Sequence, residues 1–319
     1  MNRDEMDAHP VFRKDFTIAT NAVSEASNIA LEAIFMRQTG IIFYGLSRVG
    51  KTCCIKSIHA QTSGFMPRAY VTQIEVIKQE GSYTNNIVEQ LAKEEELVFR
   101  RSTLAVEKLG QMADMIINRC HEKNCNHWVL LLDEFQRLRV HDINILFHLF
   151  NRLDRKGVTM TVLSFAMPQV FKQRDKLMEV VGGENEQLIA RFMSKLVEFK
   201  GCRSAHDLAV ILKTFDEKSE YPIGSCEPYT QNFAPAAFKA GFRLADYVQS
   251  LWQAFDAGAV GAYKNNVPLE HVFLSIRYLL RYIASHDGSK LEITSVLCTD
   301  VVERSSLKEF CLLNGRKMQ

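Results

Sequence analysis

The chain has 319 residues, of which 47% are hydrophobic and 24% are charged, and its formal net charge is +2. This length and composition predict a soluble globular protein with a large core and about two domains. No apolar run approaches the ~18 residues that a transmembrane helix needs, so we expect no membrane span. The balanced charge neither requires nor excludes a nucleic acid partner, and a DNA-binding surface would have to be local.

The N-terminal residues 1–16 are charged from the start, so they do not resemble a secretory signal, and we expect them to form an arm. The eight cysteines are scattered and lack the spacing of a disulfide framework. In a chain without an export signal they should stay reduced, so we expect a cytoplasmic location. After the arm, residues 17–35 carry apolar side chains at helical spacing and predict a helix.

The strongest motif begins at Gly45. This glycine is followed by four residues and then by Gly50-Lys51-Thr52, which is the spacing G-x-x-x-x-G-K-[ST] of a phosphate-binding loop. The apolar run 41–44 before the loop predicts a buried strand, and residues 53–60 after it predict a helix. A chance glycine turn is the alternative, and the flanking strand and helix argue against it.

In a loop of this kind, glycines let backbone N–H groups face the phosphates, and the helix N-terminus adds a positive dipole. Lys51 would reach the β- and γ-phosphates of ATP, and the Thr52 hydroxyl would bind Mg²⁺. The residues expected to bind the nucleotide here are Gly45, Leu46, Ser47, Arg48, Val49, Gly50, Lys51, Thr52 and Cys53.

The next segments predict alternating strands and helices. Residues 69–76 have the alternation of a strand, and a loop follows over 77–83. Two helices are predicted over 85–99 and 104–120, with a break at the polar residues 100–103.

A second motif closes the strand that follows. The apolar run 127–132 ends in Asp133-Glu134, and its two apolar faces suit a central strand of a parallel sheet. Asp133 would hold Mg²⁺ directly or through water, and Glu134 would orient and polarise the attacking water. The alternative is a buried strand that happens to end in two acids. Four potential zinc ligands lie at the start of this strand and just before it: Cys120, His121, Cys125 and His127. Their spacing differs from that of standard zinc sites, so it does not favour zinc binding.

Residues 143–153 predict a helix, and residues 158–166 predict a further strand. In ATPases of the AAA+ class a polar residue at the tip of this strand senses the γ-phosphate. Ser164 and, a turn later, Gln169 are the candidates here, with a plain core strand as the alternative. Arg191 could act as an arginine finger on a neighbouring subunit's nucleotide, or it could be an ordinary surface residue of a helix. One more short strand is predicted over 196–199.

The pattern of residues 204–319 predicts mainly helices, with breaks at 221–224 and 265–268. Arg243 follows a glycine by two residues, as does the second phosphate-sensing arginine that opens a lid helix. The order of motifs predicts an α/β P-loop NTPase of the AAA+ class, with a parallel sheet between helices and then a helical lid and C-terminal extension. We expect an arm over 1–16, a nucleotide-binding domain over 17–203 and a helical region over 204–319.

These motifs resemble those of the TnsC/TniB ATPases, the AAA+ regulators of bacterial cut-and-paste transposons, including CRISPR-associated ones. Residues 45–52 are similar to the family's G-x-S-R-x-G-K-T loop, and residues 132–138 to its D-E-A-x-R-L. Residues 190–192 resemble its E-R-F, and residues 241–244 resemble its lid entry. The chain departs from the family at residues 163–166, where Leu-Ser-Phe-Ala stands in place of a common Val-Gly-Thr.

The resemblance implies an ATP- and Mg²⁺-dependent ATPase that forms a homo-oligomer, as a ring or helical filament, around double-stranded DNA. It implies that the assembly links a target selector to the transposase, that Arg191 is the finger acting across a subunit interface, and that hydrolysis drives disassembly. Sequence-independent DNA binding would use basic or hydroxyl groups that contact phosphates. The candidates, each of which could equally be an ordinary surface side chain, are Lys78, Arg100, Arg101 and Thr103.

Two rival interpretations stay open from the residues alone. A helicase loader or another DNA-remodelling ATPase would use the same motifs to drive movement. A signalling or defence NTPase would use the C-terminal helices as a protein-binding platform and would not bind DNA.

Overall fold

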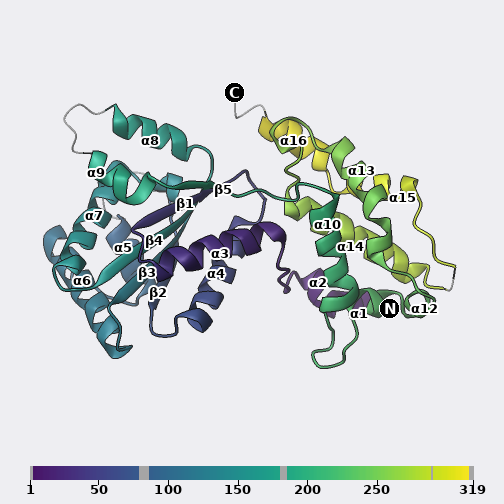
Figure 1. Ribbon diagram of the computed structural model, residues 1–319, viewed down its shortest axis with the longest axis horizontal. Helices are drawn as coiled ribbons and strands as arrows, with labels where there is room; N and C mark the ends of the chain where they lie inside the picture. The colour runs from purple at the N-terminus through teal and green to yellow at the C-terminus, as the bar shows by residue number, and fades with distance from the viewer. Residues whose placement is uncertain (1–2, 79–85, 180–184, 289, 316–319) are drawn as a thin grey trace. The chain divides into compact units, whose positions relative to one another are not determined.

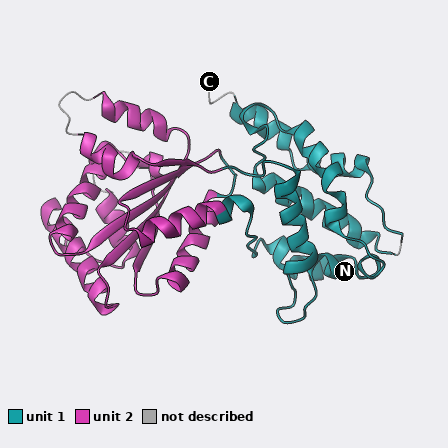
Figure 2. Cartoon of the chain, viewed as in Figure 1, with its two compact units in different colours: residues 1–24, 47–50, 200–319 teal, residues 25–46, 51–199 magenta. Residues whose placement is uncertain are grey.

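The computed structural model describes residues 3–78, 86–179, 185–288 and 290–315. Contacts divide the chain into two compact units (Figure 2). Unit 1 comprises residues 1–24, 47–50 and 200–319, and unit 2 comprises residues 25–46 and 51–199. Residues 17–24 and 47–50 therefore group with the helical residues of unit 1, although the sequence assigns them to the nucleotide-binding domain.

Unit 2 contains a five-stranded sheet in the order β2-β3-β4-β1-β5 (Figure 1). Every pair of neighbouring strands is parallel, so all carboxyl ends lie at one edge. The strands are β1 (Gly40–Tyr44), β2 (Tyr70–Glu75), β3 (His127–Asp133), β4 (Thr159–Ala166) and β5 (Leu196–Glu198). All seven residues of β3 are buried, which explains the continuous apolar run seen in the sequence.

Helices cover both faces of this sheet. α4 packs against β2, β3 and β4, whereas α5, α6 and α7 form a common core with the opposite face. The helical elements up to residue 193 are α3 (Asn21–Phe35), α4 (Lys51–Phe65), α5 (Ile87–Glu94), α6 (Ala105–Glu122), η2 (Phe135–Arg137), α7 (Val140–Asp154), α8 (Val170–Met178), α9 (Glu186–Leu188) and η3 (Ile189–Met193).

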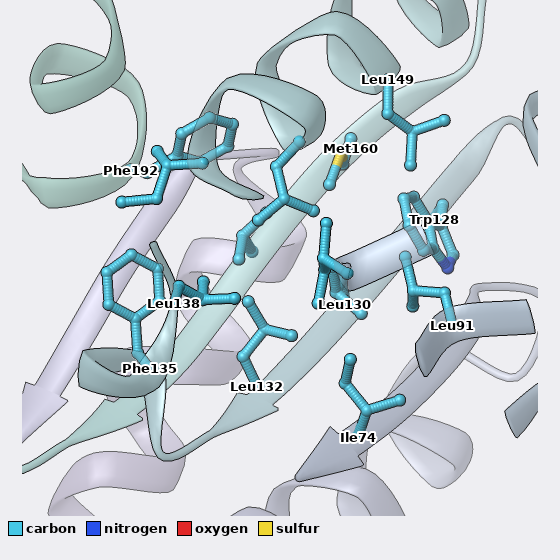
Figure 3. Packing of buried hydrophobic residues seen from close by; sticks show 14 of the residues in the cluster. Ile74, Leu91, Trp128, Leu130, Leu132, Phe135, Leu138, Leu149, Met160 and Phe192 are labelled. Atoms are coloured by element: carbon cyan, nitrogen blue, oxygen red, sulfur yellow. The ribbon is translucent and has the colours of Figure 1, made fainter. Parts of the chain in front are cut away.

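The core of unit 2 explains the sequence pattern of its elements. On one face of the sheet, side chains of β2, β3 and β4 meet those of the covering helices, including Ile74, Trp128, Leu149 and Met160 (Figure 3). Trp128 also satisfies its indole N–H, which donates to Thr72 Oγ1 at 2.9 Å. Burial of such large apolar side chains is the dominant favourable contribution to folding.

The helix predicted over 85–99 is shorter than expected, because α5 ends at Glu94. Glu96 adopts a left-handed backbone with φ of 55°, which an uninterrupted helix does not tolerate. The neighbouring Glu95 carboxylate accepts hydrogen bonds from the hydroxyls of Tyr70 and Thr72 on β2. These hydrogen bonds between Glu95 and β2 are tertiary contacts, which helical periodicity does not predict.

Unit 1 is helical, as the sequence pattern of residues 204–319 predicts. Its elements are α1 (Arg3–Ala8), α2 (Pro10–Arg13), α10 (Ala205–Lys213), η4 (Thr214–Lys218), α11 (Tyr229–Phe233), α12 (Pro235–Lys239), η5 (Leu244–Tyr247), α13 (Val248–Gly258), η6 (Gly261–Tyr263), α14 (Leu269–Ser285), α15 (Ser295–Arg304) and α16 (Leu307–Gly315).

The part of the expected N-terminal arm that the structure describes is helical and groups with unit 1. α1 and α2 belong to unit 1, and His9 between them is fully buried. Its ring lies 4.6–4.9 Å from the rings of Tyr221, Tyr229 and Phe233. Val11 of the same segment is fully buried, and the Phe12 ring lies 5.7 Å from that of Phe233. None of the helices in the described ranges is long and apolar enough to span a membrane.

Candidate nucleotide-binding site

The phosphate-loop motif has the strand-loop-helix geometry that its spacing predicts. β1 ends at Tyr44, and the N–H of Gly45 donates to the Ala166 carbonyl of the neighbouring β4 at 3.0 Å. Gly50 has a φ of 106°, which favours glycine, and α4 begins one residue later at Lys51. The first turn of α4 offers backbone N–H donors and the positive end of the helix dipole.

Lys51 is folded back onto its own loop. Its Nζ donates to the carbonyl oxygens of Gly45 (2.9 Å) and Leu46 (2.7 Å), and only 6% of the residue is exposed. Burial lowers the pKa of Lys51 to about 8, against the opposing effect of the Glu134 and Asp133 carboxylates. The ammonium group therefore lies at the mouth of the loop, held by neutral oxygens that an anionic phosphate would outcompete.

Thr52 and Asp133 bring together the two predicted Mg²⁺ ligands. The Thr52 hydroxyl donates to Asp133 Oδ2 at 2.8 Å, and Asp133 is 4% exposed. Within the described ranges no three His, Cys, Asp or Glu side chains cluster as a metal site. A hydroxyl beside one carboxylate suits Mg²⁺, which proteins commonly bind through one or two carboxylates, waters and substrate phosphates. The donor set therefore fits the ion that the motif implies.

Glu134 follows directly and has an unusual backbone. Its φ of 61° lies in the left-handed region, and its N–H donates to Asp133 Oδ1 at 2.9 Å. Such strain in a non-glycine residue is common at functional sites. Two neighbours that the motif spacing did not indicate bind its carboxylate, Gln136 at 2.8 Å and Arg137 at 3.1 Å. Their polar character right after the acidic pair was the available signal.

The structure places Ser164 inside the sheet. It pairs in register with Leu132 on β3 and Ile42 on β1, two residues before β4 ends. Its Oγ is buried and has no hydrogen-bond partner among the residues that the structure describes. Its role as the γ-phosphate sensor remains a prediction.

Arg191 lies in the short element η3 and stacks on aromatic rings of α7. Its guanidinium carbon lies 4.2 Å from the Phe150 ring centre and 4.8 Å from that of Phe147. Its Nη1 donates to Asn151 Oδ1 at 3.1 Å. Cation–π contacts of this kind hold the side chain against its own subunit, so a finger role in trans requires the guanidinium to leave these rings.

Arg243 is engaged within unit 1. Its Nη1 donates to the carbonyl oxygens of Phe242 (2.7 Å) and Phe238 (3.1 Å), and its guanidinium carbon lies 3.7 Å from the Phe238 ring centre. It occupies the N-cap position of η5, and its side chain makes no capping hydrogen bond. Its role as a phosphate sensor remains a prediction.

Residues 47–50 of the phosphate loop belong to unit 1, and Arg48 contacts the C-terminal helices of that unit. Arg48 Nη1 lies 2.8 Å from Glu270 Oε1, and its guanidinium lies 5.1 Å from the Phe310 ring centre. Leu46 and Val49 are buried, Ser47 is half-buried and Cys53 is exposed. The backbone and not the side chains of these residues is what a phosphate would contact.

The candidate DNA-binding residues lie on two connections of unit 2. Lys78 is exposed just after β2, whereas Arg100 and Arg101 are exposed between α5 and α6. Thr103 is half-buried, and its N–H donates to the Arg100 carbonyl at 3.0 Å. None of the three cations forms an ion pair with another described residue.

The sheet order, the loop after β1 and the acidic end of β3 define the AAA+ fold of P-loop ATPases, as predicted. No family model and no curated protein matches the sequence. Among solved structures, the chain is similar to the Aeropyrum pernix ORC2 protein in its ADPNP-ADP complexes, with a TM-score of 0.61 and 13% identity, over 93% of this chain and 71% of that one.

Two further structures support the same fold. Cdc6p from Pyrobaculum aerophilum has a TM-score of 0.54 at 9% identity, over 91% of this chain and 68% of its own. The Drosophila ORC bound to DNA has a TM-score of 0.53 at 13% identity, over 90% of this chain and 70% of its own. The AAA+ part of the predicted resemblance is thus confirmed at the level of the fold.

Proposed function

We propose that this protein is an ATP-dependent, DNA-associated AAA+ ATPase that oligomerises on duplex DNA and regulates transposition by linking target selection to a transposase. The observation that carries the ATPase is the contact between Thr52 and Asp133. It places a hydroxyl and a carboxylate of two distant motifs at one point, and the charges of Glu134 and Asp133 act on Lys51 nearby.

In the proposed reaction, Lys51 binds the β- and γ-phosphates, and the backbone N–H groups of the loop orient them. Thr52 and Asp133 would hold Mg²⁺, which when bound would neutralise charge on the phosphates. Glu134 orients the attacking water and accepts its proton. Ser164 and Arg243 are the proposed sensors of the γ-phosphate.

The proposed homo-oligomer depends on Arg191. Acting across an interface, its guanidinium completes a neighbour's site, so that nucleotide binding and assembly stabilise each other. The stacking of Arg191 on Phe147 and Phe150 suits a resting position that assembly exchanges for the neighbour's phosphates.

The proposed DNA contacts are Lys78, Arg100, Arg101 and Thr103, of which the three cations are exposed. Contacts of this kind bind phosphates without reading sequence, and they weaken steeply with salt. The structural similarity to an ORC bound to DNA supports DNA as the ligand. The cytoplasmic, DNA-associated location and the roles of target selector and transposase rest on the motif resemblance to the TnsC/TniB family.

A helicase-loader-like or other remodelling ATPase is the second candidate, because it would use the same phosphate loop and acidic strand end to drive movement. A test separates the two: the purified protein is incubated with fluorescent duplex DNA and ATP or a slowly hydrolysed analogue. A regulator assembles on the duplex with nucleotide and leaves the strands paired, whereas a remodelling enzyme separates the strands or moves along them. A signalling or defence NTPase would hydrolyse ATP while ignoring the DNA.

A further inference from the structure

Gln136 and Arg137 bind the same oxygen of Glu134. Gln136 Nε2 donates to Glu134 Oε2 at 2.8 Å, and Arg137 Nη2 lies 3.1 Å from this oxygen. No described residue donates a hydrogen bond to the other oxygen, Oε1. One carboxylate oxygen is therefore anchored and the other is open.

The orientation of the Gln136 amide is set from outside. The backbone N–H of Met167, the residue that follows β4, donates to Gln136 Oε1 at 2.9 Å. Because an N–H requires an acceptor, the amide oxygen must face Met167, and the NH₂ group must then face Glu134. Met167 Sδ also lies 3.5 Å from Lys51 Nζ. Gln136 thus connects the end of β4, beside Lys51, to the Glu134 carboxylate.

Arg137 makes the corresponding connection to β2. Its Nη1 lies 3.0 Å from Glu75 Oε1 and donates to the Val76 carbonyl at 3.1 Å. Both Glu75, the last residue of β2, and Val76 lie at the carboxyl edge of the sheet. Arg137 therefore bridges Glu134 and a neighbouring strand end, and charge-assisted bonds of this kind are the stronger ones.

The short helix η2 that carries both side chains is fixed by its apolar neighbours. Phe135 is 0% exposed and Leu138 is 4% exposed, and both lie in the core of unit 2 (Figure 3). Gln136 and Arg137 stand between them, partly exposed toward Glu134. A rigid support of this kind is what holds a reactive group in one orientation.

We propose that Gln136 and Arg137 are positioning residues for ATP hydrolysis, which hold Oε2 of Glu134 so that Oε1 faces the attacking water. In that step the water oxygen bonds to the γ-phosphorus, the bond from phosphorus to the ADP oxygen breaks, and one water proton passes to Glu134 Oε1. Gln136 also connects the end of β4 to Glu134 through hydrogen bonds, whereas the buried Ser164 hydroxyl forms none with a described residue. The inference rests on the proposed ATPase function and goes beyond it by naming what orients its base.

The test measures steady-state ATP hydrolysis and the affinity for a fluorescent, slowly hydrolysed ATP analogue in the full-length protein. Gln136→Leu removes both amide bonds at similar size, and Arg137→Leu removes the charged bond while Arg137→Lys retains a cation. Gln111→Leu and Arg155→Leu make the same changes at exposed positions of α6 and after α7. Thermal melting shows whether each variant folds.

We expect Gln136→Leu to lower kcat about 10- to 100-fold, as loss of orientation of a general base should, with analogue affinity changed less than about threefold. Arg137→Leu should also lower kcat, and Arg137→Lys should recover part of it. In a Glu134→Gln background Gln136→Leu should cause no further loss, because both changes act on one step. The two control variants should match the wild-type protein.

Three results would overturn the inference: an unchanged kcat in Gln136→Leu, a loss confined to analogue affinity, or an additive loss in the Glu134→Gln background. If Gln136→Leu does not fold, Gln136→Asn, which is too short to reach both partners, and the Arg137 pair decide the matter by the same criteria. A wild-type protein that binds and hydrolyses no ATP would instead reject the proposed function itself, so the two failures are distinguishable.

Discussion

The Thr52 hydroxyl donates a 2.8 Å hydrogen bond to the Asp133 carboxylate across a sequence separation of 81 residues. The sheet order explains this contact. β1 and β3 are parallel and only β4 lies between them, so the segments that follow them emerge at one edge. Two motifs that are distant in the chain thus become one candidate magnesium–phosphate site.

Lys51→Ala should abolish tight nucleotide binding, because it removes the cation at the mouth of the phosphate loop. Loss of a buried charged partner typically costs 2–5 kcal/mol, so the affinity should fall by about 30-fold to 4,000-fold. Titration with a fluorescent ATP analogue measures this effect. Lys56→Ala removes an exposed lysine one turn further along α4 and should leave binding intact. Undiminished binding in Lys51→Ala would reject the loop assignment.

Glu134→Gln should retain nucleotide binding but lower turnover by about 100-fold or more, because an amide cannot accept the water proton. If hydrolysis drives disassembly, this variant should also stay longer on duplex DNA after ATP is added. Single-turnover hydrolysis and dissociation from labelled DNA provide the two measurements. Glu32→Gln on α3 is the exposed control. Wild-type turnover in Glu134→Gln would show that another group orients the water.

Arg191→Ala should bind nucleotide normally and hydrolyse it slowly, because the arginine completes a neighbour's site and not its own. Loss of an arginine finger lowers kcat by about 10³-fold or more. Mixing Arg191→Ala with Glu134→Gln should restore part of the activity, since a Glu134→Gln subunit supplies Arg191 to a neighbour that keeps Glu134. An inactive mixture that still assembles would mean that Arg191 does not act in trans.

His9 should make the docking of α2 sensitive to acid. Burial lowers the pKa of His9 to about 4 from 6.5, and the groups around it, Tyr221, Tyr229, Phe233 and Asn232, carry no charge. The folded state resists protonation, so stability is full above pH 6.5, falls as the pH drops, and levels off below 4. The opening free energy of α2 should be about 2 kcal/mol smaller at pH 5 than at pH 7.5.

Hydrogen exchange of the α2 amides, corrected for intrinsic exchange rates, measures this opening. His9→Gln should lose the pH dependence, whereas His121→Gln, at an exposed site on α6, should keep it. An equal pH dependence in His9→Gln and the wild-type protein would assign the effect to another group.

The sequence predicts well what adjacent residues determine. The spacing from Gly45 to Thr52 requires a strand before it and a helix after it, and the apolar run before Asp133 requires a buried strand. Contacts between distant elements are what it misses. Nothing near Glu95 signals its capture by Tyr70 and Thr72, which helps to end α5 early.

Several side-chain contacts of the candidate site residues are likewise contacts between distant elements, which the sequence does not predict. The sequence is compatible with Arg191 as a surface residue or as an arginine finger. Its stacking on Phe150 depends on how η3 packs against α7, which the sequence does not indicate. The bond between Gln136 and the Met167 backbone likewise depends on the register of β3 and β4. Motif spacing identifies which residues carry the chemistry, whereas the fold determines what orients them.

Nucleotide occupancy of the Lys51 loop should control assembly of the protein on double-stranded DNA. Mass photometry of the protein with a blunt duplex, in the presence and absence of a slowly hydrolysed ATP analogue, tests it most directly. We expect DNA-bound oligomers only with the analogue, and we expect them to be lost in Lys51→Ala and weakened by raised salt. A protein that stays monomeric and leaves the duplex free under every nucleotide condition would contradict it.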